Sequence, residues 1–327
     1  MQNITGRMIK RIMESGIAEE IDETIMIDGE QRVIRTVKSP ALDENGNIDG
    51  ILGIFWDITE QKRLEEKYHH AQKMESLGLL AGGVAHDLNN VLSGIVSQPD
   101  LLLLELPEDS PMRNSIMAIK KSGLRAAAIV ADLLTIARGV AIAKKPLKVN
   151  AIIEDYIHSS EFEELKRVHP SVTTKTSLDT NLLYISGSEA HLRKVIMNLV
   201  SNAFESIKNS GEILISTTSR YIDKPIRGYK DVKVGEYAVL SVSDNGQGIP
   251  PDSLEKIFEP FYSKKKVGRS GTGLGLTVVW NVVQDLSGYI DVVSDGNGTI
   301  FKLYFPVTRD EVKDEVPVPF EEYKGNG

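Results

Sequence analysis

The chain has 327 residues, of which 41% are hydrophobic and 26% charged, the values of ordinary globular domains. Its net charge of -8 argues against a basic nucleic-acid-binding surface, and with no cysteine it has neither disulfides nor thiolate metal ligands. No run of about 18 apolar residues occurs, and the N-terminus lacks the apolar core of a signal peptide. We therefore expect two or three domains, no transmembrane segment, no nucleic-acid partner and a cytoplasmic location.

Residues 1–59 are predicted to be mostly β-structure. Segments 24–27, 31–37 and 49–57 are rich in Ile, Val and Thr, and the Asp-Gly and Asn-Gly pairs between them are hairpin signals. Three strands in about 60 residues make a poor independent core. We interpret this segment as the C-terminal part of a larger domain.

Residues 60–138 are predicted to form a helical hairpin with a turn at 107–111. Both helices carry apolar or small residues spaced alternately by three and four, the pattern of a bundle seam. The seam positions are Leu77, Ala81, Val84, Leu88, Val91 and Ile95, then Ile116, Ile119, Gly123, Ala126, Val130, Leu133 and Ala137. One hairpin hides only part of such a seam, so we expect a homodimeric four-helix bundle.

Residues 139–148 are predicted to be a linker, and residues 149–307 an α/β domain with a mixed sheet. Helices are expected from an Asn150 cap to about 168, over 189–208 and over 274–286. Strands are expected at 172–177, 182–186, 213–219, 237–244, 289–294 and 299–305. Residues 308–327 are predicted to be a charged tail or linker.

His86 stands out among the six histidines because the seam assignment places it on the exposed side of its helix. Asp87 follows it directly, and Asn90 lies one turn later on the same face. A neutral imidazole oriented by a carboxylate, which also takes its proton, can act as a nucleophile. A plain surface histidine fits the same pattern equally well.

Three further patterns suit a nucleotide. Asn198 and Asn202 lie four apart on one helix, where their amides can hold hydrated Mg²⁺ and phosphates, although this spacing is common. Segment 244–249 (DNGQGI) follows a strand, so Asp244 can accept a hydrogen bond from the amine of adenine; an ordinary glycine-rich turn is the alternative. Segment 271–276 (GTGLGL) opens a helix and suits phosphate, and the cations at 264–266 and 269 before it are either phosphate contacts or a solvated charge run.

The order and spacing of these patterns resemble the core of bacterial two-component sensor histidine kinases over about residues 60–306, with a PAS-like end before it. Segment 83–90 (GVAHDLNN) resembles the H box, 198–202 the N box, 258–261 (FEPF) the F box, and 244–248 and 271–275 the two glycine boxes. The implied fold is multidomain α+β. It comprises an antiparallel fragment of a PAS domain, the dimeric helical hairpin and an α/β sandwich ATP-binding domain of the gyrase, MutL and histidine kinase superfamily.

The resemblance also implies the roles of residues. His86 would accept the phosphoryl group of ATP, Asp87 would be the general base, and Asn90 would position water for dephosphorylation of the partner. Asn202 would bind Mg²⁺, Asp244 would contact adenine N6, and Lys264 would contact phosphate. The remaining nucleotide-binding positions are Asn198, Gly246, Gly248, Gly271, Thr272, Gly273, Gly275 and Thr299. The phosphoryl group would pass to an Asp of a response-regulator receiver domain, and the tail 320–327 resembles the linker before such a domain in hybrid kinases, so we expect a fragment cut at both ends.

Three other functions compete with this one. ATPases of the gyrase, MutL and chaperone type use a glutamate base where this chain has Asn198, which argues against hydrolysis. A Ser/Thr kinase of the same superfamily would not need a His-Asp pair on a bundle helix. A dimerising nucleotide-binding scaffold without catalysis is the non-enzyme alternative.

Overall fold

The computed structural model describes residues 2–27, 30–138, 144–224, 232–254, 256–263 and 272–309. Within them, side chains are described except at 2–7, 30–31, 63, 66–67, 69–71, 73–86 and 137–138. The chain divides into two compact units, Met1–Glu75 and Ser76–Gly327. Across the described ranges, no helix has the length and apolar character needed to cross a membrane.

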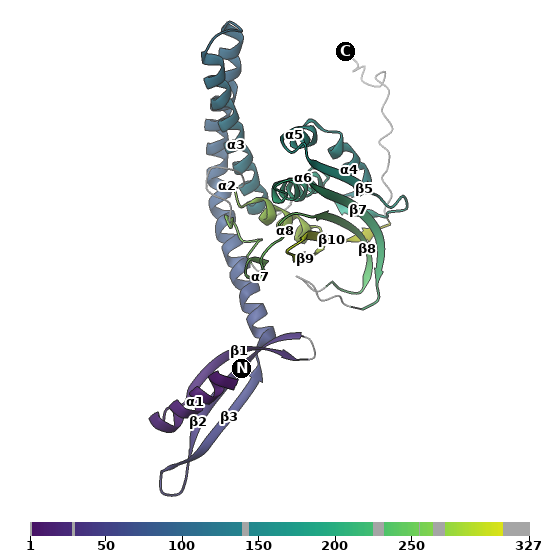
Figure 1. The fold of residues 1–327 in the computed structure, drawn as a ribbon. Helices are drawn as coiled ribbons and strands as arrows, with labels where there is room; N and C mark the ends of the chain where they lie inside the picture. Colours follow the sequence, from purple (N-terminus) through teal and green to yellow (C-terminus); the bar gives the residue numbers. More distant parts are fainter. Residues whose placement is uncertain are drawn as a thin grey trace, which may run out of the picture. The chain divides into compact units, whose positions relative to one another are not determined.

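The N-terminal unit is a three-stranded antiparallel sheet with one helix packed on it (Figure 1). Strands β1 (Glu19–Ile27), β2 (Glu30–Leu42) and β3 (Ile48–Asp57) are joined in sequence order. The β2–β3 turn is held by Asp43, whose carboxylate accepts the N–H groups of Asn45 and Asn47. Helix α1 (Gln2–Ser15), which the sequence analysis did not anticipate, buries Met8 and Ile12 and contacts β2 and β3.

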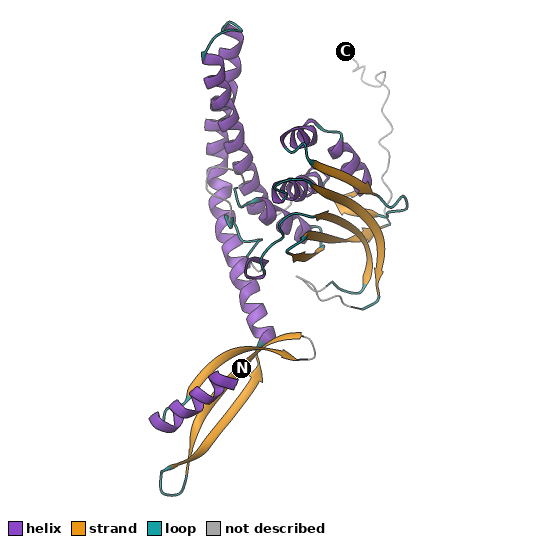
Figure 2. Cartoon of the chain, viewed as in Figure 1, coloured by secondary structure: helices purple, strands orange, loops and turns teal. Residues whose placement is uncertain are grey.

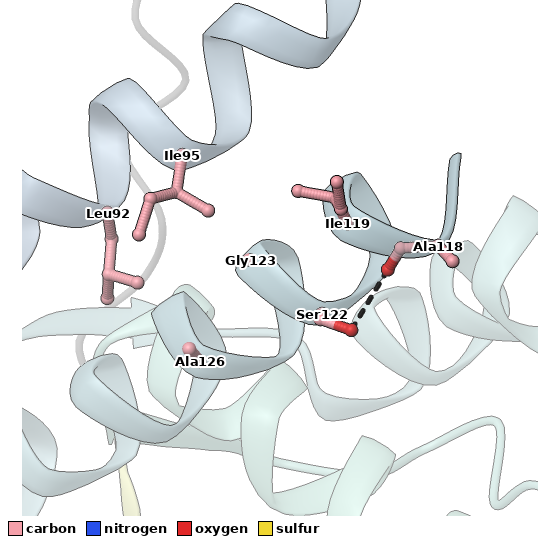
Figure 3. Close-up of a pocket in the computed structure, with 7 residues that line it drawn as sticks. All are labelled: Leu92, Ile95, Ala118, Ile119, Ser122, Gly123 and Ala126. Carbon is pink, nitrogen blue, oxygen red and sulfur yellow. Dashed lines mark hydrogen bonds between the residues drawn. The ribbon is translucent and has the colours of Figure 1, made fainter. Parts of the chain in front are cut away.

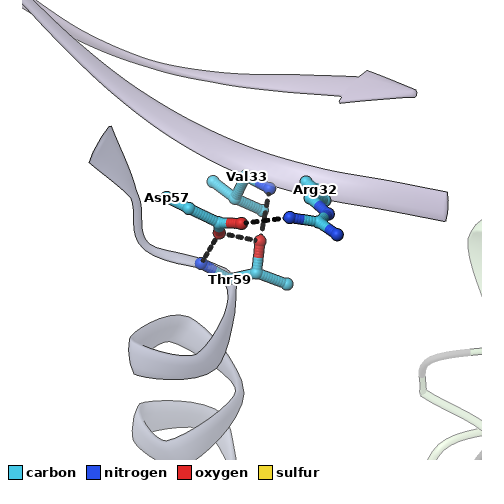
Figure 4. A network of polar contacts seen from close by, with 4 residues as sticks. All are labelled: Arg32, Val33, Asp57 and Thr59. Atoms are coloured by element: carbon cyan, nitrogen blue, oxygen red, sulfur yellow. Dashed lines mark hydrogen bonds and ion pairs between the residues drawn. The ribbon is translucent and has the colours of Figure 1, made fainter. Parts of the chain in front are cut away.

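A polar network fixes the point where this sheet leads into helix α2 (Thr59–Glu105) (Figure 4). The Asp57 carboxylate accepts the Thr59 N–H at 2.9 Å and its hydroxyl at 2.5 Å. Arg32 pairs with the same carboxylate at 3.2 Å, and the Val33 N–H donates to Thr59 Oγ1 at 2.9 Å. The bonds from Thr59 and then from Arg32 lower the pKa of Asp57. Thus the first residue of α2 is bonded to both β2 and β3.

Helices α2 and α3 (Met112–Arg138) form the predicted hairpin. The Arg113 guanidinium joins the two helices at their turn by donating to the carbonyls of Leu103 and Leu106, each at 2.9 Å. It thereby satisfies carbonyl groups at the C-terminal end of α2, which have no partner within the helix. Gly123 is buried at the point where the two helices approach each other. A Cβ there would lie 3.0 Å from the Ile95 side chain, so glycine permits this close approach.

The C-terminal part of the second unit is a seven-stranded sheet with helices on one face (Figure 2). Strands β4 (Lys145–Leu147), β6 (Tyr184–Gly187), β10 (Gly298–Thr308), β8 (Gly235–Asp244), β7 (Gly211–Ile222) and β5 (Val172–Ser177) are neighbours in this order, and β9 (Tyr289–Asp295) also pairs with β10. Only the β5–β7 pair among the described strands of this sheet is parallel. The sheet is therefore mixed, as predicted.

Helices α4 (Val149–Ile157), α6 (Glu189–Ser206) and α8 (Gly275–Asp285) build the main core of this domain. Its fully buried side chains come from α6, from α8 and from the helix-facing side of the sheet. They include Leu192, Ile196, Leu199, Val279, Ile213, Ile215 and Leu240. A second apolar cluster contains Tyr237, Val239 and Tyr304, of which Tyr237 and Val239 lie on the opposite side of β8 from Leu240.

Three local predictions were wrong. The single helix expected up to residue 168 is two helices, α4 and α5 (Ser160–Val168), because the Ser159 hydroxyl accepts the Phe162 N–H and starts a new helix. Asn150 caps neither: its amide donates to the Asp179 carbonyl and accepts from the Thr217 hydroxyl, each at 2.8 Å. In addition, residues 145–147 of the predicted linker form strand β4, and α7 (Pro251–Leu254) was not foreseen.

Candidate nucleotide and phosphotransfer site

Helix α6 carries both asparagines of the predicted N box. Its apolar stripe, which includes Leu199 and Val200, is buried in the core, while Asn198 and Asn202 are half-buried one turn apart. The Asn198 amide donates to the Gly275 carbonyl at 3.1 Å, which ties α6 to the first residue of α8. The amide oxygens of both residues are of the kind that Mg²⁺ accepts as ligands.

Asp244 is the last residue of β8 and faces the helices. Alternation along the strand puts it on the same side as the buried Leu240 and Val242. It is only 8% exposed, and its Oδ1 accepts the Ser206 hydroxyl at 2.7 Å and the Gly246 N–H at 2.9 Å. Burial raises the pKa of Asp244, while the bonds from Ser206 and from the backbone of Gly246 and Thr299 lower it.

Glycine is required in the loop after Asp244 because the backbone is tightly surrounded. Gly248 has φ +69°, and a Cβ there would lie 1.7 Å from the Asp295 carbonyl oxygen. A Cβ at Gly246 would lie 2.1 Å from the Ser206 hydroxyl. The loop therefore forms a cradle of bare backbone, packed against Ser206 and Asp295, beside the buried carboxylate of Asp244.

Thr299 lies directly across the sheet from Asp244 and is buried. Its hydroxyl is 2.9 Å from that of Ser294, which also donates to the Gly298 carbonyl and accepts the Ile249 N–H at 2.7 Å. Ser294 and Thr299 thus hold the far end of the glycine loop against β9 and β10.

The second glycine box begins outside the described residues, where Lys264–Lys266, Arg269 and Gly271 fall. Thr272 accepts the Leu274 N–H at 3.2 Å just before α8. Gly273 has φ +71°, and its carbonyl accepts the N–H of Phe261, which itself has φ 63°. A Cβ at Gly273 would lie 2.6 Å from the Phe261 carbonyl carbon. This contact and the left-handed φ mean that only glycine fits position 273 without strain.

His86, Asp87 and Asn90 all lie on α2 and so form a group separate from the nucleotide residues along the chain. The side chain of His86 lies outside the description, whereas Asp87 and Asn90 are exposed. In the part of the chain that is described, no cluster of three His, Asp or Glu residues suited to a metal occurs.

The hairpin touches the nucleotide-binding domain through the C-terminal half of α3. Helix α3 contacts α8, and Asp132 of α3, 7% exposed, pairs with Lys194 of α6 at 2.8 Å. Lys194 precedes Asn198 by one helical turn. An ion pair therefore links the hairpin to the helix that carries the N box.

Sequence reasoning did not single out Ser206 or Ser294, although both contact the glycine loop. Ser206 carried one usable signal, because it follows Asn202 by one turn on the same helix. Ser294 carried none for its contact with the glycine loop, since the Ile249 N–H that it accepts comes from 45 residues earlier in the sequence.

Comparison with known families assigns both parts of the chain. Residues 187–309 match the model of the histidine kinase-, DNA gyrase B- and HSP90-like ATPases, and residues 5–63 match the PAS fold. The chain is 34% identical over 307 residues to sensor kinase CckA of Brucella abortus, covering 92% of this chain and 32% of that protein. It is 27% identical over 278 residues to sporulation kinase C of Bacillus subtilis, covering 82% of this chain and 60% of that one.

The ATPase domain of the chain is of the histidine kinase type, and its homologues are sensor histidine kinases. The chain spans 32% of the length of the first of these relatives and 60% of the second, less than two thirds of each. Full-length ShkA, solved in complex with AMPPNP, has the same fold over 70% of this chain and 46% of its own, with a TM-score of 0.56 and 22% identity. The predicted fold class, with a PAS-like sheet, a helical region and an ATPase domain, is therefore confirmed.

Proposed function

We propose that this chain transfers the γ-phosphoryl group of ATP to His86 and then to an aspartate on the receiver domain of a response regulator. The observation that carries the proposal is Asp244, a buried carboxylate beside the glycine loop in an ATPase domain of the histidine kinase type. The AMPPNP complex of ShkA, which shares the fold, supports ATP as the donor.

In the proposed reaction, Asp244 accepts a hydrogen bond from the adenine amine. The glycine loops hold the base and phosphates through backbone N–H groups. Asn202, with Asn198, would hold Mg²⁺, which neutralises phosphate charge. A ring nitrogen of His86 attacks the γ-phosphorus as the bond to ADP breaks, and Asp87 takes the ring proton. Asn198, in place of a glutamate base, favours transfer over hydrolysis.

A homodimer is the second part of the proposal. The hairpin presents an apolar groove between α2 and α3, lined by Leu92, Ile95, Ala118, Ile119, Ser122, Gly123 and Ala126 (Figure 3). Predicted seam residues of this surface are exposed in the single chain: Ile119, which lines the groove, is 54% exposed, and Val91 is 63% exposed. A second hairpin would cover this surface. Val91→Glu with Ile119→Glu is expected to yield monomers in sedimentation, and an unchanged dimer would refute this seam.

Incubation of the full chain with γ-³²P-ATP tests the phosphotransfer. We expect acid-labile label on the chain, its loss in His86→Gln with ATP binding retained, and its retention in the control His158→Gln, an exposed position. Free phosphate alone would instead indicate an ATPase, and acid-stable label a Ser/Thr kinase. Absence of label and of phosphate would leave the non-catalytic scaffold.

Phosphatase activity toward the receiver is also proposed, through Asn90. It lies one helical turn after His86 on α2 and is exposed, so it lies on the helix face that a receiver docking at His86 would meet.

A further inference from the structure

Ser206, the last residue of α6, is bonded to the first glycine box through both of its oxygens. Its hydroxyl lies 2.7 Å from Asp244 Oδ1, and its carbonyl accepts the N–H of Gln247 at 3.4 Å. The same hydroxyl is 2.9 Å from the Ala203 carbonyl. A hydroxyl has one hydrogen to donate. The carboxylate is closer and charged, so it is the stronger acceptor, and Ser206 donates its hydrogen bond to Asp244.

The carboxylate of Asp244 is nearly saturated by its own domain. Ser206 and the backbone N–H groups of Gly246 and Thr299 supply three donors. An ionised carboxylate accepts about four hydrogen bonds. The three donors fix the plane of the group and leave room for about one more donor, which is what a single exocyclic amine offers.

Electrostatics give Ser206 a further effect on the same group. Burial raises the pKa of Asp244, and the bond from Ser206 is the largest influence that lowers it. Without that bond the buried carboxylate would be harder to keep ionised. A protonated carboxyl would itself carry a donor hydrogen and would be a weaker acceptor for the hydrogen bond from the adenine amine.

Shape complementarity shows that the two positions are matched. A Cβ on Gly246 would meet the Ser206 hydroxyl at 2.1 Å, so the hydroxyl fills the space that a side chain at 246 would take. Ser206 lies on the helix that carries Asn198 and Asn202, and therefore joins the adenine side of the site to the amide side.

We propose that Ser206 is a positioning residue for base recognition: its hydroxyl orients Asp244 toward the exocyclic amine of a 6-aminopurine nucleotide. The proposal rests on the proposed function, in that Asp244 is taken to contact adenine. It adds a residue that sets the preference for adenine over purines without the amine.

A cycle of variants and ligands tests it, with calorimetry of the full chain. The ligands are ATP and the triphosphate of purine riboside, whose ring lacks the amine. Ser206→Ala should bind ATP roughly tenfold more weakly, about 1.4 kcal/mol, and the amine-free analogue with little change. Ser206→Cys, which keeps the volume but is a poor donor, should behave like the alanine variant and carries the test if that variant unfolds.

Ser171→Ala is the matched control, because its exposed hydroxyl donates to the Asn209 carbonyl on the same domain. It should bind both ligands as the native chain does. Equal weakening of both ligands in the Ser206 variants, or native affinity for ATP, would overturn the positioning role. A native chain that binds neither ligand would instead refute the proposed function itself.

Discussion

Gly248→Ala is the substitution for which the structure sets the sharpest expectation. The residue has φ +69°, and the new Cβ would lie 1.7 Å from the Asp295 carbonyl oxygen and 2.8 Å from its carbon. These are backbone atoms of β9, which cannot rotate away as a side chain would. The glycine loop or the end of β9 must therefore move.

The expected loss has two parts. A left-handed conformation costs an alanine about 1–2 kcal/mol, and overpacking adds about 1–3 kcal/mol. For a domain of this size, a total of about 2–5 kcal/mol lowers the Tm by roughly 4–20 °C.

Scanning calorimetry of the full chain measures this change, with Gly296→Ala as the control. Gly296 lies in the neighbouring turn and has no positive φ, and among the described residues no atom lies within 4 Å of the place that its new methyl group would take. The control should unfold within about 0.5 kcal/mol of the native chain. If Gly248→Ala melts together with Gly296→Ala, the argument that this cradle admits only glycine is wrong.

Three other expectations concern separate parts of the chain. Ser287→Gly should stabilise the domain by about 0.5–1 kcal/mol in thermal unfolding, because Ser287 has φ 56° just after α8 and glycine has no penalty there; lower stability would contradict this. The bond from Arg35 lowers the pKa of Asp22 to about 2. The stability that this ion pair contributes is therefore present above about pH 4 and is lost toward pH 2. Arg35→Gln should move the midpoint of the Asp22 titration, followed by NMR, toward 3.8, and an unmoved midpoint would exclude the pair. Asn90→Ala should keep autophosphorylation but slow receiver dephosphorylation, whereas equal loss of both would indicate a structural role.

Most elements were predictable because their signals are local. Strand β5 matches its predicted span residue for residue, since β-branched residues and flanking turn residues bound it. The break at Ser159 was missed because the apolar spacing continues across it, and only the serine cap separates α4 from α5. Strand β4 was missed because three residues containing a proline have no strand pattern until β6 pairs with them.

The site was predictable to the extent that its residues cluster along the chain. Asp244 and Gly248 belong to one short segment whose glycine spacing indicates a backbone cradle. The partner that orients Asp244 comes from 38 residues earlier, so the spacing within the glycine segment does not point to it. Long-range hydrogen bonds of this kind depend on how α6 ends against β8, which only the packed domain determines.

The ion pair between Asp132 and Lys194 affects how the hairpin and the nucleotide-binding domain come apart. Separation returns both ions to water, and their hydration offsets much of the lost attraction. An apolar contact of the same area has no such compensation and would adhere more strongly. The pair thus gives the contact between α3 and α6 a defined orientation while adding little to its strength.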